Sequence, residues 1–148
     1  MVKFVKLNPK AHIPTQGSKM AAGYDLYACI PDDEKSFVHI SPHSTVKIGT
    51  GLAIQPPKGH FGAIFARSGF ATKQGLRPAN CVGVADYDYT GEYIVAIHND
   101  TDFTRIIRHG DRIAQLVFLP YADEEFVEVE NLNETERGDG GFGFGRVL

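Results

Sequence analysis

The chain has 148 residues, a formal net charge of −3 and 43% hydrophobic residues, a size and composition typical of one globular domain with a single core. Acidic and basic residues are interspersed, so no basic stripe is present and we expect no nucleic-acid partner. The chain lacks a run of about 18 apolar residues and a signal-like start, so we expect no membrane span and a soluble, cytoplasmic protein.

Alternating apolar residues predict short strands along most of the chain. In chain order, we expect them at Val2–Leu7, Phe37–Ile40, Val46–Ile54, Phe61–Phe65, Tyr93–Ile97, Ile113–Phe118 and Phe126–Val129. Turn-rich pieces separate these strands, which favours an antiparallel sandwich or barrel. We expect at most one short helix, between Gly69 and Gly75, and a mobile glycine-rich end at residues 137–146.

Several residues stand out from a plain β-fold. Gln115 lies among apolar neighbours in its strand and is either a structural glutamine bonded to nearby backbone or a functional amide. Cys29 and Cys81 are isolated and have no metal-site spacing, so we expect both to be buried small hydrophobes.

The segment from Asp86 to Glu92 contains two carboxylates and two phenols, with Thr90 and Gly91 predicted as a hairpin turn. One carboxylate could act as a general base on water, or Asp88 could cap the turn while the tyrosines pack. Arg67, Ser68 and Gly69 precede the predicted helix and form a candidate anion site, although such a tripeptide is also a common surface turn.

Taken in chain order, five segments resemble the five motifs of the trimeric dUTP pyrophosphatase family. They are Ala22–Ala28, Arg67–Ala71, Gly83–Gly91, Gly110–Leu116 and Arg137–Gly143, and together they span nearly the whole chain. The resemblance implies an all-β, distorted antiparallel β-barrel of the jelly-roll kind at residues 1–136, with a flexible arm at 137–148. It also implies a bacterial or phage-infected host cell as the setting.

The resemblance further implies hydrolysis of dUTP to dUMP and pyrophosphate, which limits uracil incorporation into DNA and supplies dUMP for thymidylate synthesis. Asp86 would be the base that deprotonates the attacking water. Tyr89 would lie under the deoxyribose and exclude UTP. Asn80 and the backbone at Gly83 and Val84 would hydrogen-bond the uracil edge, leaving cytosine with unpaired groups.

Phosphate binding is implied for the remaining motif residues. Mg²⁺ is expected on the triphosphate, with Asp25 touching the hydrated ion only through water. Each site of the implied homotrimer would lie between subunits, and a third chain would donate the arm. The substrate-binding residues implied are Arg67, Ser68, Gly69, Asn80, Gly83, Val84, Tyr89, Gln115, Arg137, Phe142 and Gly143.

Two alternatives stay open at this point. The related dCTP deaminases place a catalytic glutamate immediately before the last glycine of the third motif, where this chain has Thr90. A non-catalytic, nucleotide-binding or regulatory trimer is the other alternative. It is kept open by the altered arm, in which Phe144 replaces the usual hydroxyl residue after Gly143.

Overall fold

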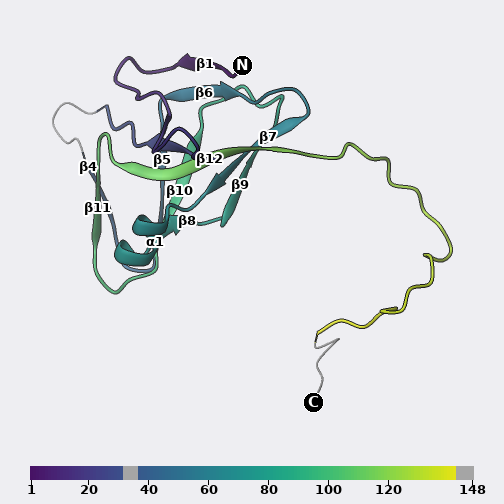
Figure 1. The fold of residues 1–148 in the computed structure, drawn as a ribbon. Coiled ribbons are helices and arrows are strands. Elements are labelled where there is room, and N and C mark those ends of the chain that lie inside the picture. Colours follow the sequence, from purple (N-terminus) through teal and green to yellow (C-terminus); the bar gives the residue numbers. More distant parts are fainter. Residues whose placement is uncertain (32–36, 143–148) are drawn as a thin grey trace.

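The structure is a computed structural model that describes residues 1–31 and 37–142. Within these residues the chain forms twelve strands and one short helix (Figure 1). The elements are β1 (Lys3–Lys6), β2 (Thr15–Gln16), β3 (Tyr24–Tyr27), β4 (Phe37–Ile40), β5 (Thr45–Gly49), β6 (Leu52–Gln55), β7 (His60–Phe65), α1 (Ser68–Gln74), β8 (Leu76–Pro78), β9 (Val82–Ala85), β10 (Ile94–Asn99), β11 (Arg105–Arg108) and β12 (Arg112–Pro120).

The strands form four antiparallel sheets around one core. Their strand orders are β1-β6, β5-β10-β8, β11-β4 and β2-β3-β12-β7-β9. Each sheet contributes buried side chains to the core, such as Leu52, Ile97, Ile40 and Leu116, which are all at most 1% exposed. Burial of one such side chain contributes about 1.5–3 kcal/mol. The predicted all-β, jelly-roll-like architecture with one short helix is confirmed. Among the described residues, the four sheets are not joined into one continuous sheet.

Strand β12 organises the largest sheet because it pairs with β3 on one side and β7 on the other. Gln115 of β12 lies opposite Asp25 of β3 and Phe65 of β7. Directly opposed residues in an antiparallel sheet project from the same face. These three residues, far apart in sequence, therefore share one outer face of the sheet.

The expected single strand Val46–Ile54 is divided in the structure. Val46 and Ile48 belong to β5, whereas Leu52 and Ile54 belong to β6 of a different sheet. The break falls at Gly51, whose φ of 67° favours glycine and whose added Cβ would lie 2.9 Å from the Ala11 Cβ and Cys29 Sγ atoms.

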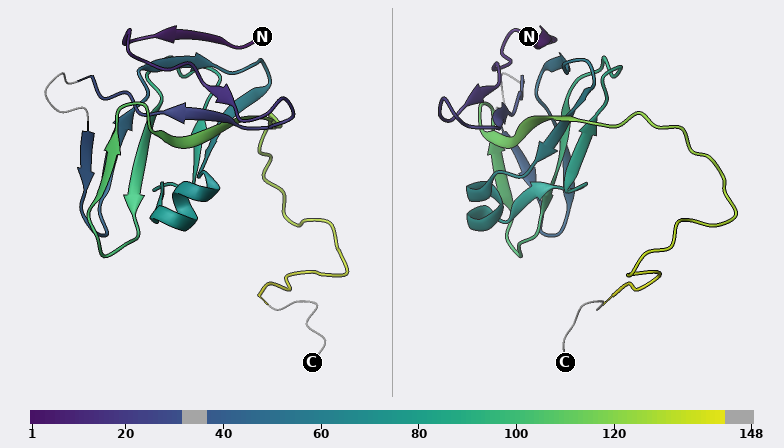
Figure 2. Two further views of the ribbon diagram at one scale, coloured as in Figure 1. Left: turned by 60° about the vertical axis from the view of Figure 1, so that its left-hand side comes forward. Right: turned by 45° about the vertical axis from the view of Figure 1, so that its right-hand side comes forward.

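Two further strand expectations are wrong. No strand forms at Phe126–Val129, because the chain leaves the sheets after Tyr121, whose N–H still donates to the Gly59 carbonyl, and extends away from the rest of the described residues (Figures 1 and 2). The predicted hairpin across Thr90 and Gly91 is also absent from the described pairing, since β9 pairs with β7 while β10 pairs with β5 and β8.

The two cysteines differ in environment. Cys29 is buried as expected, but Cys81 is exposed, which overturns that part of the expectation. Cys81 has a φ of 64°, so it lies in a left-handed turn between β8 and β9. None of the described helices is long and apolar enough to cross a membrane.

Candidate active site

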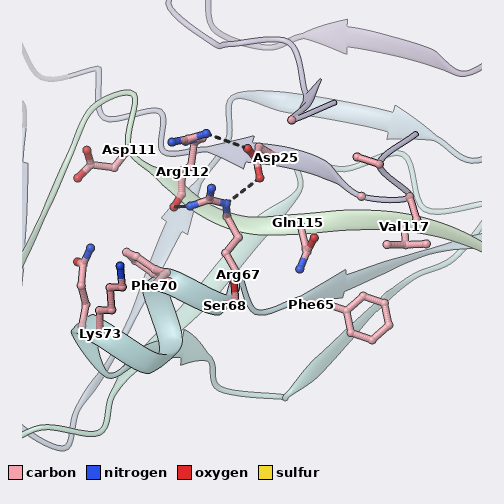
Figure 3. Close-up of a pocket in the computed structure, with 16 residues that line it drawn as sticks. Asp25, Phe65, Arg67, Ser68, Phe70, Lys73, Asp111, Arg112, Gln115 and Val117 are labelled. Atoms are coloured by element: carbon pink, nitrogen blue, oxygen red, sulfur yellow. Dashed lines mark hydrogen bonds and ion pairs between the residues drawn. The ribbon is translucent and has the colours of Figure 1, made fainter. Parts of the chain in front are cut away.

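A pocket of about 770 Å³ opens beside the first turn of α1 (Figure 3), and we call it the arginine pocket. Its walls come from β3, β7, α1, β12 and the turns that precede β3 and β12. The lining residues are Gly17, Ala21, Ala22, Gly23, Asp25, Phe65, Arg67, Ser68, Gly69, Phe70, Lys73, Gln74, Asp111, Arg112, Gln115 and Val117.

One carboxylate holds two guanidinium groups in this pocket. Arg67 Nε donates to Asp25 Oδ1 at 2.7 Å, and Arg112 Nη1 donates to Asp25 Oδ2 at 3.3 Å (Figure 3). The Asp25 side chain is only 13% exposed and the Arg67 side chain 25%, so water screens their attraction less than on an open surface. Asp25 therefore sets the position of both arginines.

The arginine pocket carries more positive than negative charge. Arg67, Arg112 and Lys73 line it as cations, whereas Asp25 and Asp111 are its acidic residues. Asp111 Oδ2 is already occupied, because it accepts from the Arg108 backbone N–H at 2.7 Å. The excess cationic charge favours an anionic ligand.

Gln115 lies on the floor of the pocket, on the same strand as Arg112 and three residues after it. Its Nε2 donates to the Ala66 carbonyl at 2.8 Å. This is the backbone contact of a structural glutamine, but the side chain is only partly buried and also lines the pocket. Gly23 leaves room for this amide, since a Cβ at that position would lie 2.5 Å from Gln115 Oε1.

Helix α1 begins at Ser68, one residue before the start predicted from the sequence. Arg67 precedes it with an extended backbone (φ −88°, ψ 135°) and makes no capping side-chain hydrogen bond. Its first turn contains Ser68 and Gly69, both exposed, and no acidic residue. Gly75 ends the helix with a left-handed φ of 65°.

A second pocket of about 240 Å³ lies beside the edge strand β9, and we call it the β9 pocket. It is lined by Ile64, Asn80, Gly83, Val84, Ala85, Asp86, Tyr89, Glu92, Tyr93 and Ile94. A tight turn follows β9, in which the Tyr89 backbone N–H donates to the Asp86 carbonyl at 3.2 Å. Tyr89 is held from its other end, because its hydroxyl donates to the Glu92 carbonyl at 2.9 Å.

Tyr93 lies beneath this turn with its ring centroid 6.3 Å from that of Tyr89. Its side chain is buried, and its hydroxyl has no hydrogen-bond partner among the described residues. Burial raises the pKa of the Tyr93 phenol to about 12, with smaller contributions from Tyr89 and Asp86. The neutral phenol is therefore strongly favoured in the folded chain.

The residues predicted from the sequence fall into two pockets that share no lining residue. Asp25, Arg67, Ser68, Gly69 and Gln115 line the arginine pocket, whereas Asn80, Gly83, Val84, Asp86 and Tyr89 line the β9 pocket.

The remaining predicted residues lie elsewhere. Arg137 and Phe142 are exposed on the segment that follows β12, residues 121–142, which we call the extended segment, and Arg137 Nε donates to the Gly140 carbonyl at 2.7 Å. Gly143 lies outside the described residues. Sequence reasoning missed Arg112 and Lys73, although Arg112 lies within the fourth motif and Lys73 is one helical turn beyond Gly69.

Comparison with known proteins identifies one family. The dUTPase family model matches residues 9–145. The chain is 45% identical over 143 residues to the deoxyuridine 5'-triphosphate nucleotidohydrolase of Desulfitobacterium hafniense, which covers 96% of this chain and 92% of the relative. It is 41% identical over 138 residues to the protein of that name from Candida albicans, covering 92% and 82% of the two chains.

Solved structures agree with this match. A mutant of Staphylococcus bacteriophage 80alpha dUTPase with dUpNHpp superposes with a TM-score of 0.86 at 27% identity, covering 97% of this chain and 96% of that chain. The dUTPase from phage phi11 of S. aureus superposes with a TM-score of 0.80 at 25% identity, covering 91% and 99%.

Proposed function

The chain belongs to the dUTPase family, and we propose from this premise that it hydrolyses dUTP to dUMP and pyrophosphate, with the triphosphate in the arginine pocket. The observation that carries the proposal is the Asp25 carboxylate holding Arg67 and Arg112 side by side next to Gln115. This arrangement presents fixed cationic donors to an anion, which is what a triphosphate needs.

Within the arginine pocket, each residue has a distinct part in phosphate binding. Arg67 uses its Nε on Asp25 and its Nη1 on the Arg112 carbonyl, so Nη2 is the nitrogen that contacts the phosphates in this proposal. The Arg112 side chain is 53% exposed and adds donors beside it. Ser68 contributes a hydroxyl and Gly69 a backbone N–H, while Gln115 contacts an inner phosphate from the floor.

Asp86 acts as the general base in this proposal. It is exposed at the mouth of the β9 pocket, where water reaches its carboxylate. A base needs only hydrogen-bond reach to the nucleophilic water, and such a group contributes roughly 10²–10⁴-fold to the rate. The water attacks phosphorus directly, so no side-chain nucleophile is required.

Recognition of the base and sugar uses the rest of the β9 pocket. Asn80 and the backbone at Gly83 and Val84 hydrogen-bond the uracil edge. Tyr89 lies under the deoxyribose, and its hydroxyl bond to the Glu92 carbonyl fixes the ring there. A ring held in this way leaves no space for a 2′-hydroxyl, which excludes UTP.

The residues fit a magnesium ion carried by the substrate. Both Asp25 oxygens accept from arginine, so this carboxylate reaches a hydrated ion through water rather than as a direct ligand. No cluster of three or more His, Cys, Asp or Glu suited to a metal occurs in residues 1–31 and 37–142. When carried by the substrate, Mg²⁺ would supply positive charge that neutralises the triphosphate.

We also propose a homotrimer with shared sites. The arginine pocket and the β9 pocket have no residue in common, so one chain offers the phosphate and base halves separately. The extended segment supports this assembly: residues 121–136 contain seven acidic residues and no lysine or arginine, yet also expose Phe126 and Leu132. Docked on another subunit, this segment brings Arg137 to the outer phosphates and Phe142 onto the uracil.

The test is pyrophosphate release from dUTP, dCTP, dTTP and UTP with Mg²⁺, comparing the full chain with residues 1–136. Rapid hydrolysis of dUTP alone supports the proposal, and loss on truncation supports the role of the arm. Absence of dUTP hydrolysis by the full chain would favour a nucleotide-binding module instead. Ammonia release from dCTP would reveal a deaminase.

A further inference from the structure

The turn between β8 and β9 carries Asn80 on the rim of the β9 pocket. Three short hydrogen bonds shape it: Ala79 N–H to the Ala96 carbonyl at 2.7 Å, Cys81 N–H to the Pro78 carbonyl at 3.1 Å, and Val82 N–H to the Asn80 carbonyl at 2.7 Å. Cys81 has a φ of 64°, a conformation that costs free energy for a residue with a Cβ. The turn therefore needs contacts from outside to keep this shape.

Arg77, at the centre of β8, supplies such contacts. Its Nη1 lies 3.4 Å from the Pro78 carbonyl oxygen and 3.6 Å from Cys81 Sγ, so one nitrogen faces both ends of the turn. The other edge of the guanidinium binds Asp100, with Nε to Oδ2 at 2.7 Å and Nη2 to Oδ1 at 3.1 Å. A two-point bond of this kind fixes the plane of the guanidinium as well as its charge.

Asp100 is itself held in place. Its backbone N–H donates to the carbonyl of Gly75, the residue that ends α1, at 2.9 Å. His98 of β10, which lies opposite Arg77 in the strand register, has its Nε2 3.5 Å from Asp100 Oδ1. Asp100 thus connects Arg77 to the end of α1 and to β10, two elements outside the turn itself.

We propose that the Arg77–Asp100 pair is a positioning device that holds Asn80 in the orientation needed to bind the pyrimidine base. The proposal rests on the proposed function of the β9 pocket, in which Asn80 contacts uracil. Arg77 acts through the turn and does not touch the substrate. Its loss therefore affects binding and discrimination of the base more than the chemical step at Asp86.

The test compares wild type with Arg77→Met, Arg77→Lys, Asp100→Asn and the double variant Arg77→Met with Asp100→Asn, using steady-state kinetics on dUTP. Arg77→Met is expected to raise KM about fivefold, equivalent to about 1 kcal/mol of binding, with little change in kcat. Arg77→Lys is expected to behave alike, because an ammonium cannot bind Asp100 at two points and face the turn as well. The double variant should lose no more than Arg77→Met if the two residues act as one device.

Two readouts separate a positioning role from general damage. Amide hydrogen exchange at residues 79–82 is expected to accelerate in Arg77→Met while exchange in β7 stays unchanged. Arg108→Met is the control, since Arg108 is an exposed arginine on a different strand, β11, whereas Arg77 is partly buried on β8. Unchanged KM and unchanged exchange in Arg77→Met overturn the inference, as does an equal effect in Arg108→Met.

Asn80→Ala separates the positioning role of Arg77 from the base-binding role of Asn80. A raised KM in Asn80→Ala together with an unchanged KM in Arg77→Met refutes the positioning role and leaves the base-binding role intact. An unchanged KM in Asn80→Ala refutes the base-binding role itself, and with it the inference.

Discussion

Gly23→Ala is a stringent test of how the arginine pocket is built. The added Cβ would lie 2.5 Å from Gln115 Oε1, 3.4 Å from its Cδ and 3.5 Å from its Cβ. Gly23 does not have a left-handed φ, so alanine introduces a steric conflict and no backbone strain. The nearest atom ends a flexible side chain, so the amide swings away before the strands shift.

The expected loss of stability follows from the hydrogen bond that this movement of the Gln115 amide breaks. Swinging the amide removes the bond from Gln115 Nε2 to the Ala66 carbonyl, now 2.8 Å long, which contributes about 1 kcal/mol. Added crowding brings the total loss in the free energy of unfolding to about 1–3 kcal/mol. A displaced amide would also lose the proposed bond from Gln115 to a charged phosphate, worth about 1.5–3 kcal/mol, so kcat/KM is expected to fall about 10- to 150-fold.

Urea unfolding and steady-state dUTP hydrolysis measure the two effects. The same Gly23 substitution in a Gln115→Ala background should cost almost no stability, because the clashing atoms are gone. Gly17→Ala is the stability control, since its added methyl meets nothing within 4 Å. Full kcat/KM in Gly23→Ala, or additive stability costs in the double variant, would refute this reasoning.

Three further predictions address other parts of the site. Asp86→Asn is expected to lower kcat by about 10²–10⁴-fold with little change in the Kd for dUTP, and ordinary turnover in this variant would remove Asp86 as the base. The free energy of unfolding of the wild type should fall as pH rises from about 10 to about 12, because the raised pKa of Tyr93 favours the neutral phenol in the folded chain. Tyr93→Phe should lack this fall. Equal pH dependence of the melting temperatures of wild type and Tyr93→Phe above pH 10 would contradict the prediction. Asp25→Asn should raise KM for dUTP, because Arg67 and Arg112 lose their shared carboxylate, and an unaltered KM would show that they need no such support.

Local sequence patterns were informative where one element decides its own structure. The expected strand Phe37–Ile40 coincides with β4, and the helix between Gly69 and Gly75 forms as α1. Glycine at the end of α1 takes a left-handed conformation that other residues adopt at a cost. Such signals lie within a few neighbouring residues and can be read from the chain alone.

Pairing between strands could not be read in this way. Phe126–Val129 has the alternation of a strand, but a strand needs a second backbone, and none of the described chain lies beside it. The segment after β9 has a hairpin-like turn sequence, yet β9 and β10 join different sheets. Alternation of apolar and polar residues indicates which residues share a face of a strand, but it does not indicate which strand is the partner.

The sequence by itself determined the fold class, the family and the residues of the motifs, because these depend on residue types and their order. Only the tertiary structure decided that Asp25 binds both Arg67 and Arg112, since the register of β3 on β12 brings residues 87 positions apart in sequence into contact. It also decided that the motif residues divide between two pockets of one chain. The physical reason is that long-range contacts arise from strand register and sheet order, which no local pattern encodes.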